Sequence, residues 1–308
     1  MRNAFQRALL RAMKADKNVM LVTGDLGYSV LEPFRDGFPK QYVNCGVAEQ
    51  SMMGIAAGLA MSGKNVFAYS IAPFASLRAL EQVRDDIAYQ NLPVKIISVG
   101  GGFSYGHQGV THCAIEDIAI MRAIPNMAVV CPVDPYETEA VIDFAVRHEG
   151  PMYIRLGKAG EKNLFKKPPK FAPGRFSVLS GKGDVALFAT GPLTWNALEA
   201  MSFLRAKGIP CRIIAASSVK PIDRRTIRKA AQECRLLVSV EEHNVMGGLG
   251  GAIAEVLAEG GSHAPLLRLG VPDVFLKKIG SQEYLRDYYN LSPKKIADAI
   301  LRRAKRNR

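Results

Sequence analysis

Short apolar runs alternate in the first half of the chain with segments whose apolar residues recur at helical spacing. The runs predict buried strands at residues 19–23, 66–69, 94–99, 127–131 and 152–155. The intervening segments predict helices at residues 49–61, 74–90, 115–122 and 135–147. Strands and helices that alternate in this way are typical of a parallel sheet with helices on both faces.

The alternation is interrupted between residues 157 and 184, where prolines, lysines and glycines dominate. It then resumes and predicts strands at residues 185–190, 211–215, 236–240 and 266–269. Helices are predicted at residues 194–207, 225–232 and 250–258, and a last one begins after Ser292-Pro293. We therefore expect an α/β protein of two tandem three-layer domains with mainly parallel sheets. The expected domains are residues 1–160 and 184–308, joined by a linker at residues 161–183.

Composition narrows the class of protein. Of the 308 residues, 48% are hydrophobic and 22% are charged, which is ordinary for a soluble globular protein, and no apolar run is long enough to cross a bilayer. The basic, amphipathic N-terminal segment also fits a transit peptide, but Asp16 and the strand-like run at residues 19–22 favour a first helix of the domain. Five cysteines without CxxC spacing or a regular framework indicate a reduced, cytoplasmic protein.

The formal net charge of +13 first suggests a nucleic-acid partner. The positive residues are scattered, however, and are dense only at residues 166–170 and in the tail at residues 302–308. No interleaved aromatic residues or nucleic-acid motif accompany them. We therefore expect no nucleic-acid partner, and interpret the excess as surface charge that attracts anionic, phosphorylated substrates.

Three segments combine unusual residues with a place after a predicted strand, where ligands bind in open α/β sheets. The first is Asn44-Cys45-Gly46-Val47-Ala48-Glu49-Gln50, in which Glu49 starts a predicted helix. The second is an aromatic-rich turn that contains Phe67, Tyr69 and Phe74. Taken alone, a glutamate at a helix start is commonly a capping residue, and aromatics in such a turn commonly belong to the core.

The third segment, residues 100–112, is a glycine-rich loop that carries His107 and His112. Glycines allow a backbone to approach a ligand closely or to take positive φ. The loop has neither a Walker lysine nor a complete G-x-G-x-x-G pattern. Because no cysteine or carboxylate completes a zinc site with the two histidines, we expect no metal ion bound by this chain.

Together these segments resemble the transketolase family, which includes deoxyxylulose-phosphate synthases and the β subunits of 2-oxoacid dehydrogenase decarboxylases. The resemblance covers nearly all of the chain, and the order and spacing of the motifs agree. In the first domain the matching segments are Gly46-Val47-Ala48-Glu49-Gln50, Leu92-Pro93-Val94, Gln108-Gly109-Val110-Thr111-His112, Glu116-Asp117, Ile124-Pro125-Asn126-Met127 and Pro132-Val133-Asp134-Pro135. In the second domain they are Glu241-Glu242-His243-Asn244-Val245-Met246-Gly247-Gly248, Gly270-Val271-Pro272-Asp273 and Tyr289-Asn290-Leu291-Ser292-Pro293.

The resemblance implies a thiamine diphosphate enzyme whose active site needs a second polypeptide. The family binds the cofactor's diphosphate through Mg²⁺ on a Gly-Asp-Gly…Asn motif in a separate domain, and Gly24-Asp25-Leu26 is not that motif. An N-terminal transketolase subunit would therefore hold the Mg²⁺ and the diphosphate. The implied assembly is an α2β2 heterotetramer that acts on sugars or sugar phosphates.

The same resemblance assigns roles to individual residues. Glu49 would hydrogen-bond the cofactor's pyrimidine, and Phe74, with Phe67 or Tyr69 nearby, would stack on that ring. Asp25 would face the cofactor. At the substrate, Ser29 would contact a phosphate, and His112 would contact donor hydroxyls and assist proton transfer.

Substrate recognition is less settled by the resemblance. Arg155 and Lys158 are competing candidates for binding a substrate anion. Gln108 stands where transketolases carry an aspartate that binds a donor hydroxyl, and Gly100 stands where they carry a histidine near the substrate phosphate. Because glutamine both donates and accepts hydrogen bonds, donor recognition should differ, and His107 is a candidate to compensate.

The expected activity is transfer of a two-carbon ketol unit from a ketose donor to an aldose acceptor. Two alternatives remain open. One is another thiamine diphosphate reaction, such as 2-oxoacid decarboxylation or deoxyxylulose-phosphate synthesis. The other is a non-catalytic assembly subunit, which the presence of Glu49, His112 and the aromatic turn disfavours.

Overall fold

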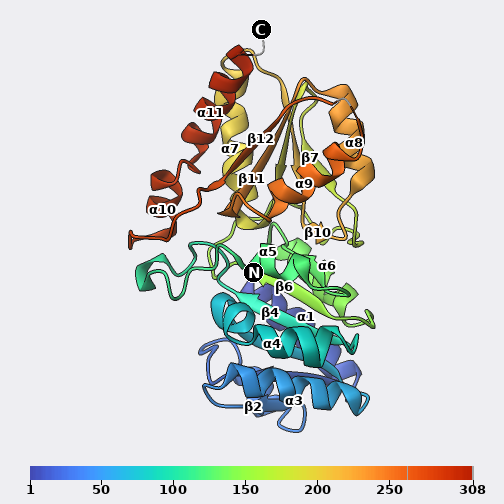
Figure 1. The fold of residues 1–308 in the computed structure, drawn as a ribbon. Coiled ribbons are helices and arrows are strands. Elements are labelled where there is room, and N and C mark those ends of the chain that lie inside the picture. The colour runs from blue at the N-terminus through green and yellow to red at the C-terminus, as the bar shows by residue number, and fades with distance from the viewer. Residues whose placement is uncertain (262, 307–308) are drawn as a thin grey trace.

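The computed structural model describes residues 1–261 and 263–306, which form two α/β domains stacked end to end (Figure 1). The first domain is built on a seven-stranded sheet and the second on a five-stranded sheet, and the strand neighbours in both sheets are mainly parallel. The predicted fold class is confirmed. None of the described helices has the length and apolar character needed to span a membrane.

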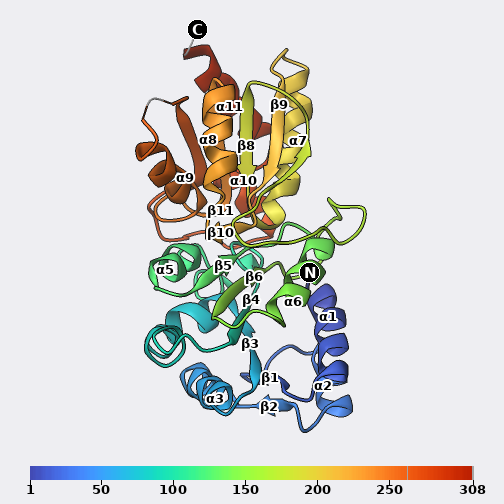
Figure 2. The ribbon, with the colours of Figure 1, turned by 90° about the vertical axis from the view of Figure 1, so that its right-hand side faces the viewer.

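The first sheet has the order β10-β5-β6-β4-β3-β1-β2. Its strands are β1 (Val19–Thr23), β2 (Tyr42–Asn44), β3 (Asn65–Ile71), β4 (Val94–Val99), β5 (Ala128–Val130), β6 (Met152–Leu156) and β10 (Ser218–Lys220). The helices around it are α1 (Arg2–Ala15), α2 (Glu32–Gly37), α3 (Glu49–Met61), α4 (Leu80–Gln82), α5 (Asp117–Ala123) and α6 (Pro135–Ala145). Helices α1 and α6 lie side by side on one face of this sheet (Figure 2).

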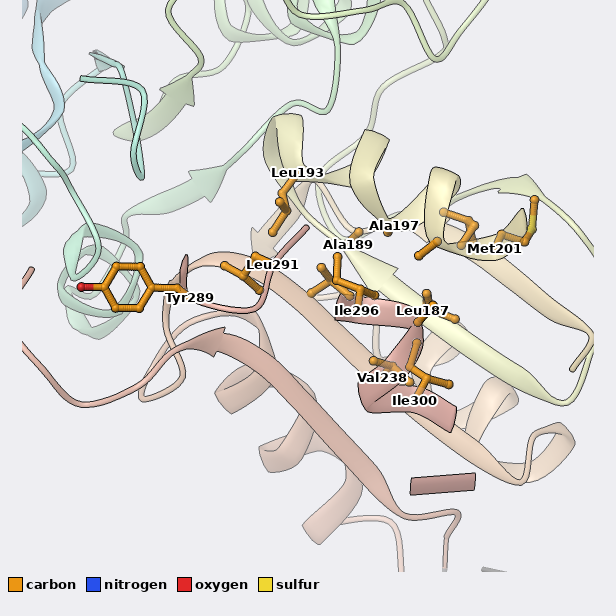
Figure 3. Close-up of a cluster of buried hydrophobic side chains, with 14 of the residues drawn as sticks. Leu187, Ala189, Leu193, Ala197, Met201, Val238, Tyr289, Leu291, Ile296 and Ile300 are labelled. Carbon is orange, nitrogen blue, oxygen red and sulfur yellow. The ribbon is translucent and has the colours of Figure 1, made fainter. Parts of the chain in front are cut away.

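The second sheet has the order β12-β11-β8-β9-β7. Its strands are β7 (Ser177–Ser180), β8 (Val185–Ala189), β9 (Cys211–Ala215), β11 (Leu236–Asn244) and β12 (Leu266–Val271). Its helices are α7 (Thr194–Arg205), α8 (Arg224–Glu233), α9 (Leu249–Ala258), α10 (Gln282–Tyr288) and α11 (Pro293–Arg306). Apolar side chains of α7 and α11 meet those of β8 and β11 in a buried cluster that extends to Tyr289, near the first domain (Figure 3).

The alternation of side chains along each strand explains how the first sheet is covered. Along β3, Val66 and Ala68 pack against α3, whereas Phe67 and Tyr69 pack against the opposite layer, which includes Phe5 of α1. This alternation is the period-two geometry of a strand buried on both faces. It fixes which side chains of β3 face each helical layer.

The structure departs from the expected elements in several places, and helices α2 and α10 were not predicted. The segment at residues 74–90 is not one α-helix, since π-helical turns at Phe74–Arg78 and Val83–Ala88 flank the short α4. Three short strands were not predicted. Strand β2 pairs with β1. Strand β7 lies inside the stretch expected to be a linker and pairs antiparallel with β9. Strand β10 pairs antiparallel with β5 of the first domain. The two domains therefore share a strand connection as well as a packed junction.

Candidate active site

The loops that carry the candidate residues meet at one edge of the first sheet. Strands β2, β1, β3, β4 and β6 are parallel neighbours, so the segments that follow them emerge at the same edge. These segments contain Asp25 and Ser29, the start of α3, the aromatic turn, the glycine-rich loop and Lys158. This edge is where open parallel sheets bind ligands.

Glu49 is the first residue of α3, and only 1% of it is exposed. The Ser70 hydroxyl donates a hydrogen bond to Glu49 Oε1 at 3.2 Å. Arg78 Nη1 donates to Glu49 Oε2 at 2.7 Å and forms an ion pair with it. Unlike a capping glutamate, Glu49 therefore directs its carboxylate to side chains that come from the end of β3 and the turn after it.

The three aromatic candidates differ in their surroundings. Phe67 and Tyr69 are buried in the core, where the Tyr69 ring stacks on Phe5 with 5.5 Å between ring centroids. Phe74 is only partly buried, and Arg78 Cζ lies 4.2 Å from its ring centroid. The Phe74 ring also meets the ring of His112 edge-on, at 5.0 Å between centroids. Of the three, Phe74 alone joins the surroundings of both Glu49 and His112.

His112 lies in the glycine-rich loop, half-buried and 3.0 Å from the Thr111 hydroxyl through Nδ1. The loop is closed on itself by two backbone hydrogen bonds, because Gly102 and Ala114 each donate to the other's carbonyl oxygen. His107 and Gln108 are exposed on a 3₁₀ turn within the loop, Gly106–Gln108. The structure thus places His112 against Phe74, and His107 and Gln108 on the surface of the same loop.

Tyr105 and Arg2 also lie at this site, and the sequence reasoning missed both. A Cβ atom on Gly100, which has a φ of +81°, would lie 2.1 Å from Tyr105 Cε2, so the Tyr105 ring occupies the space above that glycine. Lys158 Nζ lies 4.7 Å from the centroid of the Tyr105 ring, and Arg2 Nε donates to the Lys158 carbonyl at 2.6 Å. The run of glycines before Tyr105 was the available signal for it, whereas nothing in the helical pattern distinguishes Arg2.

Asp25 and Ser29 belong to the loop after β1, and both have positive φ, 56° and 64°. Asp25 Oδ1 accepts from Asn44 Nδ2 at 2.9 Å, and its backbone N–H donates to Asn44 Oδ1 at the same distance. The Ser29 N–H donates to Glu32 Oε1 at 2.8 Å. Both side chains are exposed, and Asp25 borders a small surface pocket of about 80 Å³.

Arg155 is not available to a substrate, which corrects its candidacy as an anion-binding residue. Only 4% of it is exposed, and Nε donates to Asp117 Oδ2 at 2.8 Å. Its Nη2 donates to the carbonyl oxygens of Ala114 and Glu242, at 2.7 Å and 3.1 Å. The side chain of Arg155 extends from β6 into the buried junction between the two domains. There its hydrogen bonds link Ala114, which is paired with the glycine-rich loop, to Glu242 of the second domain.

The acidic segment of β11 is also structural. Glu241 accepts from the backbone N–H groups of Leu249 and Gly250, at 2.7 Å and 2.8 Å, at the start of α9. Burial raises the pKa of Glu241 to about 7, and burial lowers the pKa of His243 to about 4. Within residues 1–261 and 263–306, no three His, Cys, Asp or Glu side chains are placed together as metal ligands would be.

Comparisons with known proteins agree with this geometry. Residues 1–160 match the model of the transketolase pyrimidine binding domain, and residues 174–296 match that of the transketolase C-terminal domain. The chain belongs to the transketolase family. Within that family it is similar over nearly its whole length to chains that form the C-terminal part of divided transketolases.

Two relatives are 39% identical to the chain. A putative transketolase C-terminal section from Methanocaldococcus jannaschii aligns over 99% of this chain and 96% of its own length. A subunit of the apulose-4-phosphate transketolase of Phocaeicola vulgatus aligns over 93% of this chain and 92% of its own length.

Solved structures show the same relation. A split-gene transketolase solved as an inactive beta4 tetramer superposes with a TM-score of 0.88 at 40% identity, covering 98% of this chain and 96% of the other. The transketolase of Campylobacter jejuni superposes with a TM-score of 0.79 at 19% identity, which shows the fold alone, and this chain covers 46% of it.

Proposed function

We propose that this chain is the pyrimidine-binding subunit of a split, thiamine-diphosphate-dependent transketolase. The reaction would transfer a two-carbon ketol unit from a ketose donor to an aldose acceptor. The convergence of Glu49, Phe74 and His112 at one edge of a transketolase fold carries this proposal. Two relatives of similar length, a transketolase C-terminal section and a transketolase subunit, support it.

The residues at this edge fit the pyrimidine of thiamine diphosphate. Phe74 offers a partly exposed ring for stacking, and Val47, two residues before Glu49, is an apolar side chain that is 74% exposed. Glu49 offers a carboxyl group held away from water, which suits a hydrogen bond to a ring nitrogen. In Phe67 and Tyr69, by contrast, the aromatic rings are enclosed in the core.

The diphosphate has no comparable place among the residues that the structure describes. No cluster of metal-ligating side chains is found there. A partner subunit that carries the diphosphate and Mg²⁺ would complete the site, in an assembly we propose to be an α2β2 heterotetramer in the cytoplasm. The relative solved as an inactive beta4 tetramer supports the need for a second kind of chain.

Bound thiamine diphosphate would supply the carbanion chemistry, and this chain would supply orientation and proton handling. Glu49 would hold a proton at the pyrimidine ring nitrogen. Phe74 would fix the plane of that ring, and Asp25 would face it from the loop after β1. His112, packed edge-on against Phe74, would contact donor hydroxyls and move a proton at the substrate oxygen.

The substrate's anionic end fits a second cluster. Lys158 is exposed at the end of β6, and Arg2 is tied to its carbonyl oxygen. Because Arg155 is buried in an ion pair, Lys158 is the better of the two candidates that the sequence left open. Ser29, His107 and Gln108 would add polar contacts from neighbouring loops.

A transfer assay on the two-chain enzyme tests this proposal. The chain is co-expressed with a diphosphate-domain subunit, and ketose donors and aldose acceptors are supplied with thiamine diphosphate and Mg²⁺. We expect a ketose two carbons longer than the acceptor, with no release of CO₂. Turnover of pyruvate with CO₂ release would instead identify the deoxyxylulose-phosphate synthase or decarboxylase alternative. An assembled, cofactor-loaded pair that reacts with neither would indicate an assembly subunit.

A further inference from the structure

Tyr105 has no role in the function proposed above, yet it lies between the two parts of the candidate site. On one side its ring faces His112 edge-on, with 6.3 Å between ring centroids. On the other, Lys158 Nζ lies 4.7 Å from the ring centroid. The glycine-rich loop thus places an aromatic ring between the proposed proton-transfer residue and the proposed anion-binding residue.

The backbone beneath this ring leaves it the space that it occupies. The ring lies against Gly100, where a Cβ atom would come within 2.1 Å of Cε2 and 2.3 Å of Cδ2. Real Cβ atoms do not approach other atoms so closely, so only glycine at position 100 leaves room for the ring. The loop is further held by the pair of hydrogen bonds between Gly102 and Ala114. The structure therefore places Tyr105 on a loop whose backbone is held by hydrogen bonds and whose glycine leaves room for the ring.

The hydroxyl of Tyr105 is in a suitable state to donate a hydrogen bond to an anion. Burial raises the pKa of Tyr105 above its usual value, and the positive charge of Arg2 opposes that rise. The phenol therefore keeps its proton at neutral pH. Arg2 is joined to this cluster through Lys158, since Arg2 Nε donates to the Lys158 carbonyl oxygen and Lys158 Nζ lies 4.7 Å from the centroid of the Tyr105 ring. An anion beside Tyr105 would thus meet one neutral O–H donor and two cations, Arg2 and Lys158.

We propose that Tyr105 is a specificity-determining residue of this enzyme. Its hydroxyl donates to the terminal anionic group of the substrate, which Arg2 and Lys158 neutralise. Its ring sets the distance between that group and His112. This inference rests on the proposed function and adds one residue to it, which would select, among the expected sugars and sugar phosphates, those whose end distant from the reacting carbon carries an oxyanion.

The first experiment compares Tyr105→Phe with the wild type in the assembled two-chain enzyme. For each enzyme, kcat and KM are measured with a phosphorylated aldose acceptor and with the same aldose lacking the phosphate. Loss of a hydrogen bond to a charged group should raise KM for the phosphorylated acceptor on the order of tenfold. The kcat and KM for the unphosphorylated acceptor, and the affinity of the enzyme for thiamine diphosphate, should not change. Tyr89→Phe, which alters a tyrosine that is 80% exposed, is the matched control.

A second measurement does not depend on turnover. Inorganic phosphate is titrated calorimetrically into the assembled wild type, Tyr105→Phe, Lys158→Met and the double variant. We expect the double variant to lose less affinity than the sum of the two single losses, because both groups act on one ion.

The inference is overturned if Tyr105→Phe leaves both the ratio of kcat/KM for the two acceptors and the phosphate affinity unchanged. That result, in an enzyme that still transfers a ketol unit, would leave the proposed function intact. A wild-type pair without any transfer would remove the proposed function itself, and the phosphate titration would still decide whether Tyr105 binds an oxyanion.

Discussion

At the residue scale, the buried carboxylates of this chain serve different purposes according to what they face. Glu241 accepts hydrogen bonds from the backbone N–H groups of Leu249 and Gly250. Glu137 accepts one from the backbone N–H group of Val133, so both carboxylates satisfy donors of the chain's own backbone. Glu49 instead accepts hydrogen bonds from the side chains of Ser70 and Arg78. Side chains can exchange partners when a ligand arrives, whereas backbone donors cannot be vacated without local unfolding. This difference separates a carboxyl group suited to catalysis from two that maintain the fold.

Replacing Glu49 by glutamine should abolish most turnover without unfolding the assembly. The substitution keeps the size and the hydrogen bond with Ser70, but the amide cannot hold and release the proton that the mechanism needs. We expect kcat to fall by about a hundredfold or more, since general acid–base groups contribute that much. Steady-state kinetics and thermal unfolding measure the two effects. Glu81→Gln, on an exposed residue of α4, is the control, and near-normal activity in Glu49→Gln would refute the assigned role.

Arg155 and Lys158 are three residues apart, and substitution should separate their roles. Arg155→Met leaves the carboxylate of Asp117 buried without its cation, so the free energy of unfolding should fall by about 3–5 kcal/mol. Lys158→Met should leave the unfolding free energy nearly unchanged and raise KM for an anionic substrate. Chemical denaturation and kinetics on both variants provide the comparison. A stable Arg155→Met protein with impaired substrate binding would reverse the assignment.

At the element scale, the glycine-rich loop is positioned by the second domain as well as by β4. The Phe103 N–H donates to Glu242 Oε1 at 2.6 Å, and Glu242 is also paired with Arg286 of α10. Gly102 has a φ of +65°, and a Cβ there would lie 2.4 Å from Glu242 Oε1. The loop that carries Tyr105 and His112 therefore depends on close contact between domains.

Gly102→Ala should accordingly lower the free energy of unfolding by more than backbone strain alone would. Gly63→Ala is the matched control, because Gly63 also has positive φ, +84°, but has nothing within 4 Å of the added atom. The control should lose about 1–2 kcal/mol of unfolding free energy from left-handed backbone strain. Gly102→Ala should lose clearly more and should also lower kcat, because Glu242 must move. Equal losses in the two variants would show that the loop does not need this contact.

Much of the architecture could be predicted at this scale because long buried strands carry a clear apolar signal. Strand β4 begins and ends as the pattern of residues 94–99 predicts, and α3 spans Glu49–Met61 as expected. The short strands β2, β7 and β10 were not predicted, because a strand of three or four residues, several of them partly exposed, is too short to show a hydrophobic alternation. The π-helical turns after Pro73 likewise share the apolar spacing of an ordinary helix.

The site was predicted less completely, for a physical reason. Glu49 and His112 could be singled out because each lies in a segment that follows a predicted strand, where ligands bind in open α/β sheets. Arg2 reaches the site only through tertiary packing, because α1 begins beside the end of β6, where Arg2 contacts Lys158. Arg155 was misjudged because strand alternation gives the face of the sheet but not whether a second domain covers it.

At the scale of the whole molecule, the chain presents the proposed pyrimidine and substrate edge without a cluster of metal ligands among its described residues. The two domains are joined by a shared strand and by a buried polar junction, so this edge is preorganised before any partner binds. Its acidic and aromatic groups alone would give a cofactor's pyrimidine few contacts. Most of the binding free energy should therefore come from the subunit that holds the diphosphate.

Calorimetric titration of thiamine diphosphate with Mg²⁺ tests this central claim most directly. It is carried out on this chain alone and on the chain co-expressed with a diphosphate-domain subunit. The split-site account predicts saturable binding to the pair and no measurable binding to the lone chain. Binding to the lone chain with the affinity of the pair would contradict it, because the diphosphate site would then lie within these 308 residues.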